Sequence, residues 1–514
     1  MERSATYLRS MLPVLSATQL READARTIAN EPISSLKLME RAAAHCTQKL
    51  LETLAWDVPV VVLAGMGNNG GDGLAMARML QSAGQRVRVI VLKHKTEGSP
   101  DFQHNLLWAT ESGLAIEVLD EGAELPEFDP GSYLIDAILG TGLQRPISGW
   151  MKEIVRALNQ RPNTVLAIDM PSGLFAEDNS GNDPEAIVQA DHTFTLEVPK
   201  LALLLPENAR FVGEWDVVPI GLDKEFIASL KPLAVVLVQA DVAALMPVRT
   251  RFSHKGDHGH AWLLAGGEGK MGAALLAAKA CLRSGTGLLT LHVPHGNDVL
   301  VHTAIPEAMV SMDVSATHLT ALPKFAKASA IGIGPGIGTD AETASMLKRL
   351  IQDAPAPLVI DADALNILAE NKTWLAFLPP GTVLTPHPKE FDRLAGASTN
   401  GYERLHKAKA LAVKMNMVLV LKGAYTAILS PDGRVFFNST GNPGMAKGGS
   451  GDALTGIITG LRAQGLDPLS AALLGVYAHG LAGDLAAKQL GLDGMLPSDL
   501  IEHLPEAWVK LRST

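Results

Sequence analysis

The strongest constraint on the fold is an alternation of short β-branched runs with helical patterns. After a helical segment over residues 16–54, buried-strand patterns occur at 58–63, 87–92, 133–136 and 164–168, and helical spacings separate most of them. Parallel strands need crossover connections, and helices on both faces of the sheet supply them. The alternation therefore predicts an α/β fold built on a parallel sheet.

A second alternation follows the first. Because the chain has 514 residues, it is too long for one hydrophobic core. Between residues 223 and 251 the sequence favours neither helix nor strand clearly. The two halves share no repeated sequence pattern. We therefore expect two different α/β domains, residues 1–222 and 223–514. The later strands are expected at 260–265, 287–292, 330–334, 358–361, 383–385 and 418–421, with a hairpin turning at Asp432-Gly433.

Composition excludes several classes of protein. A formal net charge of −10 argues against a nucleic-acid-binding face, and only two cysteines, Cys46 and Cys281, argue against a disulfide framework. The first dozen residues carry Arg3 and Arg9 without an apolar targeting segment. No run of about 20 apolar residues is apparent, so we expect no membrane span. These features favour a cytoplasmic protein that binds neither nucleic acid nor membrane.

The first chemically informative segment is glycine-rich. Residues 65–73 read Gly-Met-Gly-Asn-Asn-Gly-Gly-Asp-Gly between a strand and a helix. Glycines at such a position allow backbone amides to approach an anionic group at the helix N-terminus, but they also allow a simple tight turn. The spacing is not that of a G-x-G-x-x-G dinucleotide motif.

Two aspartates end neighbouring strands of the same domain. Asp136 precedes a glycine-containing segment at 140–146, and Asp169 precedes Pro-Ser-Gly-Leu at 171–174. Ligands of an open parallel sheet bind outside the carboxyl ends of its strands, so these groups are expected at one edge. Considered alone, each aspartate is as consistent with a helix cap as with a ligand-binding role.

Segments 68–73, 140–146 and 169–174 resemble the motifs of NAD(P)H-hydrate epimerases, over roughly residues 16–218. The resemblance implies a Rossmann-like fold that interchanges the R and S hydrates, with Asp169 as acid/base. It implies a potassium ion held by Asn69, Asp136 and Ser172. The substrate-binding residues that it implies are Asn68, Asn69, Gly70, Gly71, Asp72, Gly140, Thr141, Gly142, Leu143, Gln144, Arg145, Pro146 and Asp169.

A second glycine cluster opens a helix near the C-terminus. Residues 441–454 end in Gly448-Gly449-Ser450-Gly451-Asp452, followed by apolar residues at helical spacing. Amides at this helix start form an anion hole for a phosphoryl group, and Asp452 is placed to take a proton from an attacking hydroxyl. An aspartate there also stabilises the helix dipole, but that does not explain the glycines. The segment resembles the anion-hole motif of ribokinase-like enzymes.

Further segments narrow this resemblance to NAD(P)H-hydrate dehydratases, over roughly residues 252–508. They lie at 253–259, 266–273, 332–336, 361–366, 385–391 and 422–426. The resemblance implies hydrate binding by Ala273, Gly336, His387 and Asp452. It implies nucleotide binding by Lys422, Gly423, Ala424, Tyr425, Thr426 and Gly451. Two alternatives stay open: His387 as a rigid turn residue, and Asp361 and Asp363 as helix caps instead of partners of a magnesium-bound phosphate.

The expected enzyme is thus bifunctional, an isomerase followed by a lyase. Phosphorylating the hydrate hydroxyl makes it a good leaving group, and elimination then restores the reduced nicotinamide. The resemblance implies ADP as donor, with ATP as the alternative, magnesium at the dehydratase site, and release of AMP and phosphate. A symmetric homo-oligomer is expected on general grounds. The competing hypotheses are a ribokinase-type vitamin kinase fused to a Rossmann-like domain, and a non-catalytic nucleotide sensor.

Overall fold

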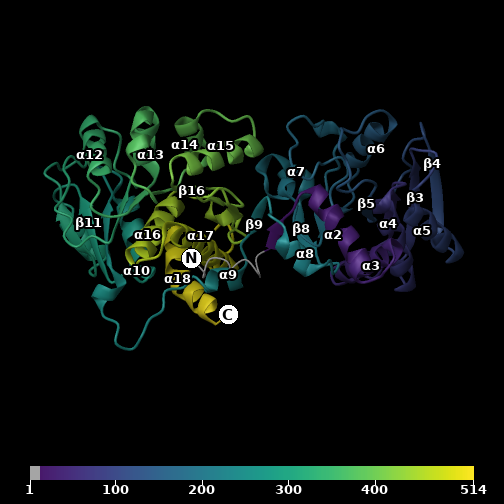
Figure 1. Ribbon diagram of the computed structural model, residues 1–514, viewed down its shortest axis with the longest axis horizontal. Helices are drawn as coiled ribbons and strands as arrows, with labels where there is room; N and C mark the ends of the chain where they lie inside the picture. The colour runs from purple at the N-terminus through teal and green to yellow at the C-terminus, as the bar shows by residue number, and fades with distance from the viewer. Residues whose placement is uncertain (1–11, 514) are drawn as a thin grey trace. The chain divides into compact units, whose positions relative to one another are not determined.

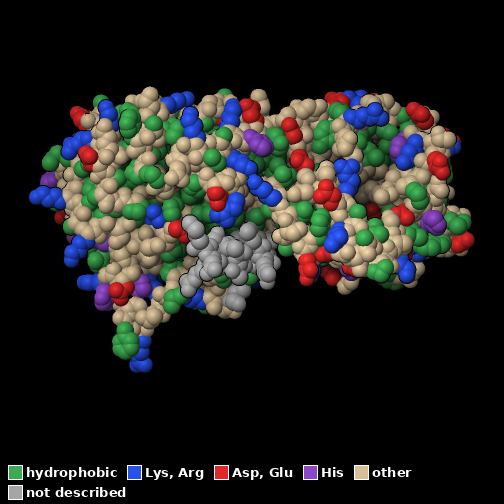
Figure 2. Space-filling view, viewed as in Figure 1, with side chains coloured by type: hydrophobic (Ala, Val, Ile, Leu, Met, Phe, Trp, Pro, Cys, Tyr) green, Lys and Arg blue, Asp and Glu red, His purple; other side chains and the backbone are tan. Residues whose placement is uncertain are grey.

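The computed structural model describes residues 12–513, which fall into two compact units, Leu12–Ala234 and the chain from Val235 onward (Figure 1). Residues 1–11, with Arg3 and Arg9 of the segment analysed above for targeting signals, and residue 514 lie outside this part. On the face shown in Figure 2, the described Lys and Arg side chains are interspersed with Asp and Glu.

The N-terminal unit contains a sheet in which every strand pairing is parallel, in the order β4-β3-β2-β5-β6-β7-β8. The order reverses between β2 and β5, which is where ligands bind in doubly wound sheets. The strands are β2 (Val60–Ala64), β3 (Val87–Lys93), β4 (Ala115–Asp120), β5 (Tyr133–Ala137), β6 (Val165–Ile168), β7 (His192–Leu196) and β8 (Glu214–Val218), and the short β1 (Leu12–Val14) precedes them.

Helices cover both faces of this sheet because consecutive strand residues, which point to opposite faces, are apolar. Val62 belongs to the core cluster that contains Leu74, whereas its neighbour Leu63 belongs to the cluster that contains Ile154. The helices are α2 (Ala17–Asn30), α3 (Ser35–Leu51), α4 (Asn68–Ser82), α5 (Pro100–Glu111), α6 (Trp150–Asn159), α7 (Ala209–Val212) and α8 (Lys224–Ser229), with 3₁₀ turns at Pro184–Ala186, Leu201–Leu204 and Pro206–Asn208.

The C-terminal unit contains a longer mixed sheet that runs β9-β18-β17-β16-β15-β14-β13-β10-β11-β12. Its pairings are parallel except β16–β17 and β17–β18, so the hairpin predicted at Asp432-Gly433 is confirmed. The strands are β9 (Ala234–Val236), β10 (His260–Leu264), β11 (Leu288–Val293), β12 (Met309–Met312), β13 (Ala330–Ile333), β14 (Leu358–Ile360), β15 (Val383–Leu384), β16 (Val418–Leu421), β17 (Ala427–Leu429) and β18 (Val435–Phe437).

Helices again form a layer on each side of the sheet (Figure 1). One layer is α12 (Ala341–Gln352), α13 (Ala362–Glu370), α14 (Pro388–Ala395) and α15 (Gly401–Lys414); the other includes α10 (Met271–Arg283), α16 (Ser450–Ala463), α17 (Pro468–Leu490) and α18 (Pro497–Arg512). The remaining pieces are α9 (Gln239–Ala243), α11 (Asp298–Ala304) and 3₁₀ turns at Lys255–His258, Lys372–Phe377 and Pro443–Met445. The predicted α/β class is confirmed in both domains, and the first has the parallel, doubly wound sheet expected of a Rossmann-like domain.

One helix is more apolar than the sequence analysis expected. Within the described residues, α17 has 23 residues and an 18-residue window of mean hydropathy 1.2, so by length and composition alone it is apolar enough to cross a membrane. That window is 72% buried inside the domain, however, and α17 packs against α16 and α18. Its apolar surface is therefore covered by protein, as in the core helix of a soluble domain.

Close packing of α10 against α16 predicts a measurable cost for one added methyl group. A Cβ at Gly456 would lie 2.0 Å from the Ala277 carbonyl oxygen, whereas a Cβ at Gly272 would meet no described atom within 4 Å. We expect Gly456→Ala to destabilise the C-terminal domain by about 1–3 kcal/mol, and Gly272→Ala to leave its stability unchanged or slightly raised. Thermal unfolding followed by calorimetry checks this. Equal transition temperatures for both variants would contradict it.

Candidate active sites

The predicted N-terminal groups meet at the carboxyl ends of β2, β5 and β6. Asn68 begins α4 after β2, Asp136 lies in β5, and Asp169 directly follows β6. A Cβ on Gly140 would lie 3.0 Å from Asp169 Oδ2 and 3.3 Å from Asn69 Cγ. The strand-end aspartates and the glycine segments are therefore neighbours, at the reversal of strand order.

Asp169 is bound to a lysine that the sequence analysis missed. Lys200 Nζ donates to Asp169 Oδ1 at 2.7 Å, and also to Thr195 Oγ1 at 2.9 Å and the Leu196 carbonyl at 2.8 Å. The Lys200 side chain is 1% exposed. Asp169 Oδ2 accepts from the Thr141 amide at 3.1 Å. Asp169 itself has φ +67°, a left-handed conformation that a non-glycine residue adopts at a cost and that is enriched at functional sites.

These contacts set the ionisation of three carboxyl groups. Burial raises the pKa of Asp169, but the Lys200 charge and hydrogen bonds from Lys200 and Thr141 outweigh it and hold the pKa below its usual range. Burial, and next the charge of Asp169, raise the pKa of Asp72 well above its usual range and that of Asp24 on α2 to about 6. An ionised carboxylate thus raises the pKa of nearby carboxyl groups, most strongly that of Asp72, and such a separation of pKa values is typical of an acid/base site.

The three residues predicted to hold a potassium ion are Asn69, Asp136 and Ser172. Asp136 is fully buried and accepts from the Ser172 hydroxyl at 2.5 Å and the Ser172 amide at 2.7 Å. Burial raises the pKa of Asp136 to about 6, with the Ser172 hydrogen bonds opposing it. Asn69 is buried, and its Nδ2 has no hydrogen-bond partner among residues 12–513. An orphaned buried amide indicates that a further group binds here.

Packing accounts for part of the glycine motif. A Cβ at Gly70 would lie 1.7 Å from the Gly65 carbonyl oxygen, and one at Gly71 would lie 2.6 Å from Met39 Sδ. Gly70 is therefore required by the turn itself, whereas at Gly71 the obstacle is the Met39 side chain of α3. In the 140–146 segment, Leu143 packs against the core cluster that contains Ile154, and the exposed members are Gly142, Gln144, Arg145 and Pro146.

The C-terminal site is centred on a second lysine–aspartate pair, in which the aspartate is buried and the lysine partly exposed. Lys422 Nζ, after β16, donates to Asp361 Oδ1 at 2.8 Å, and Thr455 Oγ1 of α16 donates to Asp361 Oδ2 at 2.6 Å. A Cβ on Gly451 would lie 3.3 Å from Lys422 Nζ. Asp361 therefore begins α13 by position, but its oxygens are used by Lys422 and Thr455, which decides against a simple capping role.

Asp452 stands in the first turn of α16, which starts after Gly449 in a left-handed conformation with φ +107°. Burial, and next the Asp361 charge, raise the pKa of Asp452 to about 6, and Lys422 opposes them. A Cβ on Gly448 would meet no described atom within 4 Å, so the backbone is accessible there. A carboxylate with a pKa near 6 beside open amides is suited to general-base chemistry.

The predicted hydrate-binding residues are partly adjacent. Gly336, with φ +67°, lies against Ala273, since its Cβ would be 3.2 Å from Ala273 Cβ. His387 caps α14, accepting from the Lys389 and Glu390 amides at 3.1 and 3.3 Å, which is the turn role left open above. Its side chain stays 44% exposed, and burial and the Lys422 charge lower its pKa, so the imidazole is neutral near pH 7.

Two further carboxylates line the region. Asp363 Oδ2 accepts from the Gly338 amide at 2.9 Å and lies 3.3 Å from Lys270 Nζ. Glu390 is buried, 3.8 Å from Lys422 Nζ, and burial raises its pKa. Among the described residues, no group of three or more His, Cys, Asp or Glu side chains is arranged to hold a metal ion by itself.

The segment predicted to bind the nucleotide, residues 422–426, forms a turn. Thr426 Oγ1 donates to the Gly423 carbonyl at 3.0 Å. Ala424 is exposed and Tyr425 is half-buried.

The anion-hole loop is supported from behind by α17. His479 Nε2 lies 2.9 Å from the Ser450 carbonyl, and Asp484 Oδ2 accepts from the Gly441 amide at 3.0 Å. Burial lowers the pKa of His479 to about 4, so this ring is neutral and donates. Lys447 turns away from the site and donates to the Asp493 and Met495 carbonyls, both at 2.6 Å. The sequence analysis did not identify these supports.

Comparison with known proteins assigns the chain to a family. A family model described as NAD(P)H-hydrate dehydratase matches residues 261–506, and the YjeF-related protein N-terminus matches 35–202. A bifunctional NAD(P)H-hydrate repair enzyme of Moorella thermoacetica is 36% identical over 510 residues, covering 96% of each chain. The chain belongs to the bifunctional NAD(P)H-hydrate repair enzymes. The Escherichia coli K12 relative is 34% identical, over 91% of this chain and 88% of its own.

The first unit of this repair enzyme therefore contains the epimerase domain, and the second contains the dehydratase domain. Among solved structures, an ADP/ATP-dependent NAD(P)H-hydrate dehydratase of Bacillus subtilis, co-crystallized with ATP/Mg²⁺, is 34% identical. It covers 53% of this chain and 97% of its own, with a TM-score of 0.48.

The buried pair in the epimerase domain predicts a large stability effect. Lys200→Met leaves the Asp169 carboxylate buried without its counterion, so we expect a loss of about 3–5 kcal/mol. Lys93→Met is the control, because Lys93 and Asp120 form an exposed pair, 50% and 75% exposed, and we expect it to cost about 0–1 kcal/mol. Urea unfolding of the N-terminal domain measures both. A loss no larger than that of the control would contradict the assignment.

Proposed function

We propose that residues 1–222 interchange the R and S hydrates of NADH and NADPH, and that residues 223–514 dehydrate the S hydrate with ADP. AMP and phosphate are the other products, and ATP is the alternative donor. The observation that supports the second step best is Asp452, whose pKa is raised to about 6 at the glycine-lined start of α16. We also propose a cytoplasmic homo-oligomer, consistent with the free, buried thiols of Cys46 and Cys281.

In the epimerase, Asp169 is the proposed acid/base for the carbon that carries the hydroxyl. Lys200 keeps its carboxylate ionised and fixes its orientation through a 2.7 Å hydrogen bond. Asp72 has a raised pKa in the same field, so it is suited to donate its own proton to the carbon after Asp169 has removed one. Thr141 orients the second oxygen of Asp169.

The fit of a potassium ion depends on the donor atoms. Asn69, Asp136 and Ser172 offer amide, carboxylate and hydroxyl oxygens, which are hard ligands suited to such a cation. The unpaired Nδ2 of Asn69 is a donor, so it would bind a hydrogen-bond acceptor of the hydrate, and only the amide oxygen would face the ion. These three residues would hold the ion, and its charge would attract electron-rich groups of the hydrate.

In the dehydratase, Asp452 is the proposed base that takes the proton of the hydrate hydroxyl. The hydroxyl oxygen then forms a bond to the terminal phosphorus of ADP, and AMP leaves. Amides at Gly448–Gly451 would stabilise the transferred phosphoryl group, with Lys422 beside them. The electron pair of the ring nitrogen expels phosphate, and loss of a proton from the adjacent ring carbon restores the reduced nicotinamide. Magnesium would enter with the nucleotide and neutralise its phosphates, near Asp361 and Asp363.

Reciprocal variants test the two assignments. Wild type incubated with mixed hydrates, magnesium, potassium and ADP or ATP should restore all of the reduced-nicotinamide absorbance. Asp452→Asn should slow dehydration by about 10²–10⁴-fold, because the base is lost. Asp169→Asn should restore the S hydrate at the normal rate and the R hydrate only at its spontaneous rate. A stable phosphorylated product instead of free phosphate would contradict the dehydratase assignment and support the vitamin-kinase alternative.

The raised pKa of Asp452 predicts an acid limb in the pH profile. Only the ionised carboxylate accepts a proton, so kcat/KM for dehydration should rise about tenfold per pH unit below pH 6 and level off above it. The nucleotide phosphate titrates in the same range. Asp363→Asn separates the two, because the Asp363 charge helps to raise the pKa of Asp452, and its loss should move the limb to lower pH. A limb that stays in place would assign the titration to the nucleotide.

A further inference from the structure

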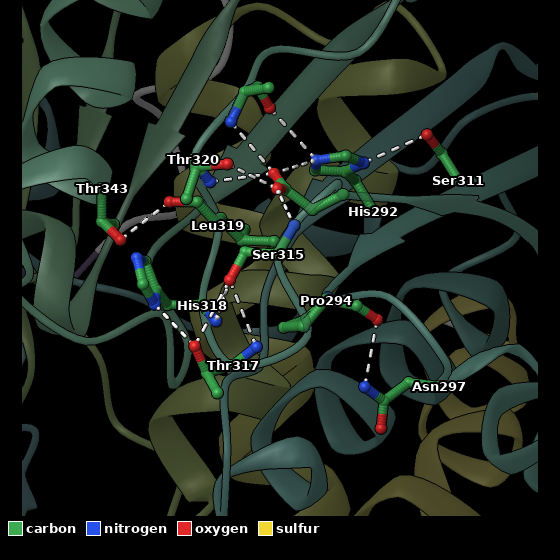
Figure 3. A network of polar contacts seen from close by, with 12 residues as sticks. His292, Pro294, Asn297, Ser311, Ser315, Thr317, His318, Leu319, Thr320 and Thr343 are labelled. Atoms are coloured by element: carbon green, nitrogen blue, oxygen red, sulfur yellow. Dashed lines mark hydrogen bonds and ion pairs between the residues drawn. The ribbon is translucent and has the colours of Figure 1, made fainter.

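A buried carboxylate organises the loop between β12 and β13, and Figure 3 shows the network around it. Asp313 is 3% exposed. Its Oδ1 accepts from the Ser315 amide at 3.0 Å and the Thr320 hydroxyl at 2.6 Å. Its Oδ2 accepts from the Thr320 and Ala321 amides at 2.9 and 3.0 Å. Both ends of loop 313–321 are thereby tied to one side chain.

A buried histidine fixes this carboxylate to the sheet. His292 of β11 places Nε2 3.3 Å from Asp313 Oδ2 and 3.2 Å from the Ala321 carbonyl, with Nδ1 3.0 Å from Ser311 Oγ. Burial lowers the pKa of His292, so the neutral ring donates from Nε2. Although burial acts the other way, the hydrogen bonds lower the pKa of Asp313 to about 2, and the carboxylate stays ionised.

The tip of the loop is anchored separately to α12. His318 Nε2 lies 3.1 Å from Glu342 Oε2, and its Nδ1 lies 2.9 Å from Thr317 Oγ1. Thr343 Oγ1 donates to the Leu319 carbonyl at 2.8 Å. Figure 3 shows Thr317 and His318 side by side at this tip. The loop is therefore held at its two ends and at its tip.

The loop meets the proposed hydrate site through its backbone. The Glu268 amide donates to the Thr317 carbonyl at 2.7 Å. A Cβ at Gly267 would lie 2.9 Å from the Gly336 carbonyl oxygen and 3.4 Å from that of Thr317. Three backbone segments therefore touch here, and Gly336 in turn lies against Ala273. A shift of Thr317 would move the turn that borders the hydrate.

We propose that Asp313 is a positioning residue for hydrate binding. It holds loop 313–321 in the shape in which the Thr317 carbonyl fixes the Gly267–Glu268 turn beside Gly336. The inference rests on the proposed function, which assigns Gly336 and Ala273 to the hydrate. Asp452 and Lys422 follow other strands of the sheet, so the effect should fall on hydrate binding and not on phosphoryl transfer.

Asp313→Asn tests this role. Whichever way the amide turns, its NH₂ group faces groups that now donate to the carboxylate, so the loop loses charged hydrogen bonds. We expect KM for the S hydrate to rise about tenfold, with kcat and KM for ADP changed less than about twofold. Epimerase activity of the same chain serves as the internal control and should stay unchanged.

Two milder variants keep the test decisive if Asp313→Asn folds poorly. Thr320→Val removes one donor to Oδ1 and should raise KM for the hydrate about threefold. Ser311→Ala removes only the outer contact of His292 and should leave all three constants unchanged. An unchanged KM for the hydrate in Thr320→Val, or a fall in kcat together with a rise in both KM values, would overturn the positioning role.

Amide hydrogen exchange supplies a readout that needs no substrate. The Glu268 amide should exchange faster in Asp313→Asn and Thr320→Val than in wild type, because its acceptor Thr317 is less fixed. Unchanged exchange would overturn the inference even if KM moved. Failure of the proposed function looks different: wild type would not restore reduced nicotinamide from the hydrate at all, whereas the exchange result would stand.

Discussion

A lysine paired with a buried aspartate at the carboxyl ends of parallel strands is the interaction on which both candidate sites depend. Lys200 is paired with Asp169 in the first domain, and Lys422 with Asp361 in the second. Desolvating two charges is costly unless each is well bonded, and both pairs have additional partners in Thr195 and Thr455. In the first domain Lys200 holds the Asp169 carboxylate ionised, and in both domains the charge of the paired aspartate raises the pKa of a neighbouring carboxyl.

This arrangement separates roles between otherwise similar groups. Next to the ionised Asp169, Asp72 keeps its proton, and next to Asp361, Asp452 has a pKa of about 6. The two domains do so with different partners, because in the first the lysine binds the proposed acid/base itself. In the second, the lysine binds an aspartate adjacent to the proposed base. A common electrostatic solution therefore serves a proton transfer in one domain and a phosphoryl transfer in the other.

The sequence predicted much of the fold because strand and helix periods differ. It missed β4, β7 and β8 in the first domain, β9 and β12 in the second, and the short β1. The reason is visible in β7, where Thr193 and Thr195 are fully buried although they are polar. Missing β7 also hid Lys200, which follows that strand and reaches Asp169 across the sheet edge. No local pattern marks such a residue; only the pairing of β6 with β7 brings it there.

The glycines show a similar limit. In sequence, Gly70 and Gly448 are equally typical of phosphate-binding turns. In the structure a Cβ at Gly70 would overlap a backbone carbonyl, whereas one at Gly448 would be unobstructed. The positions of the strand-end aspartates were easier to predict, because the carboxyl ends of parallel strands lie at one edge of the sheet whatever the details of packing. His387 proved to be a helix cap within the predicted site, so the two readings of that residue are compatible.

The support of the anion-hole loop by α17 has a consequence for how the chain tolerates change. Thr440, Gly441 and Ser450 are each tied to this buried helix, through Tyr477, Asp484 and His479. The loop is therefore shaped before a nucleotide arrives, and little conformational entropy remains to be lost on binding. A substitution at Tyr477, His479 or Asp484 of this mostly buried helix would therefore change the shape of the glycine loop without touching a bound nucleotide.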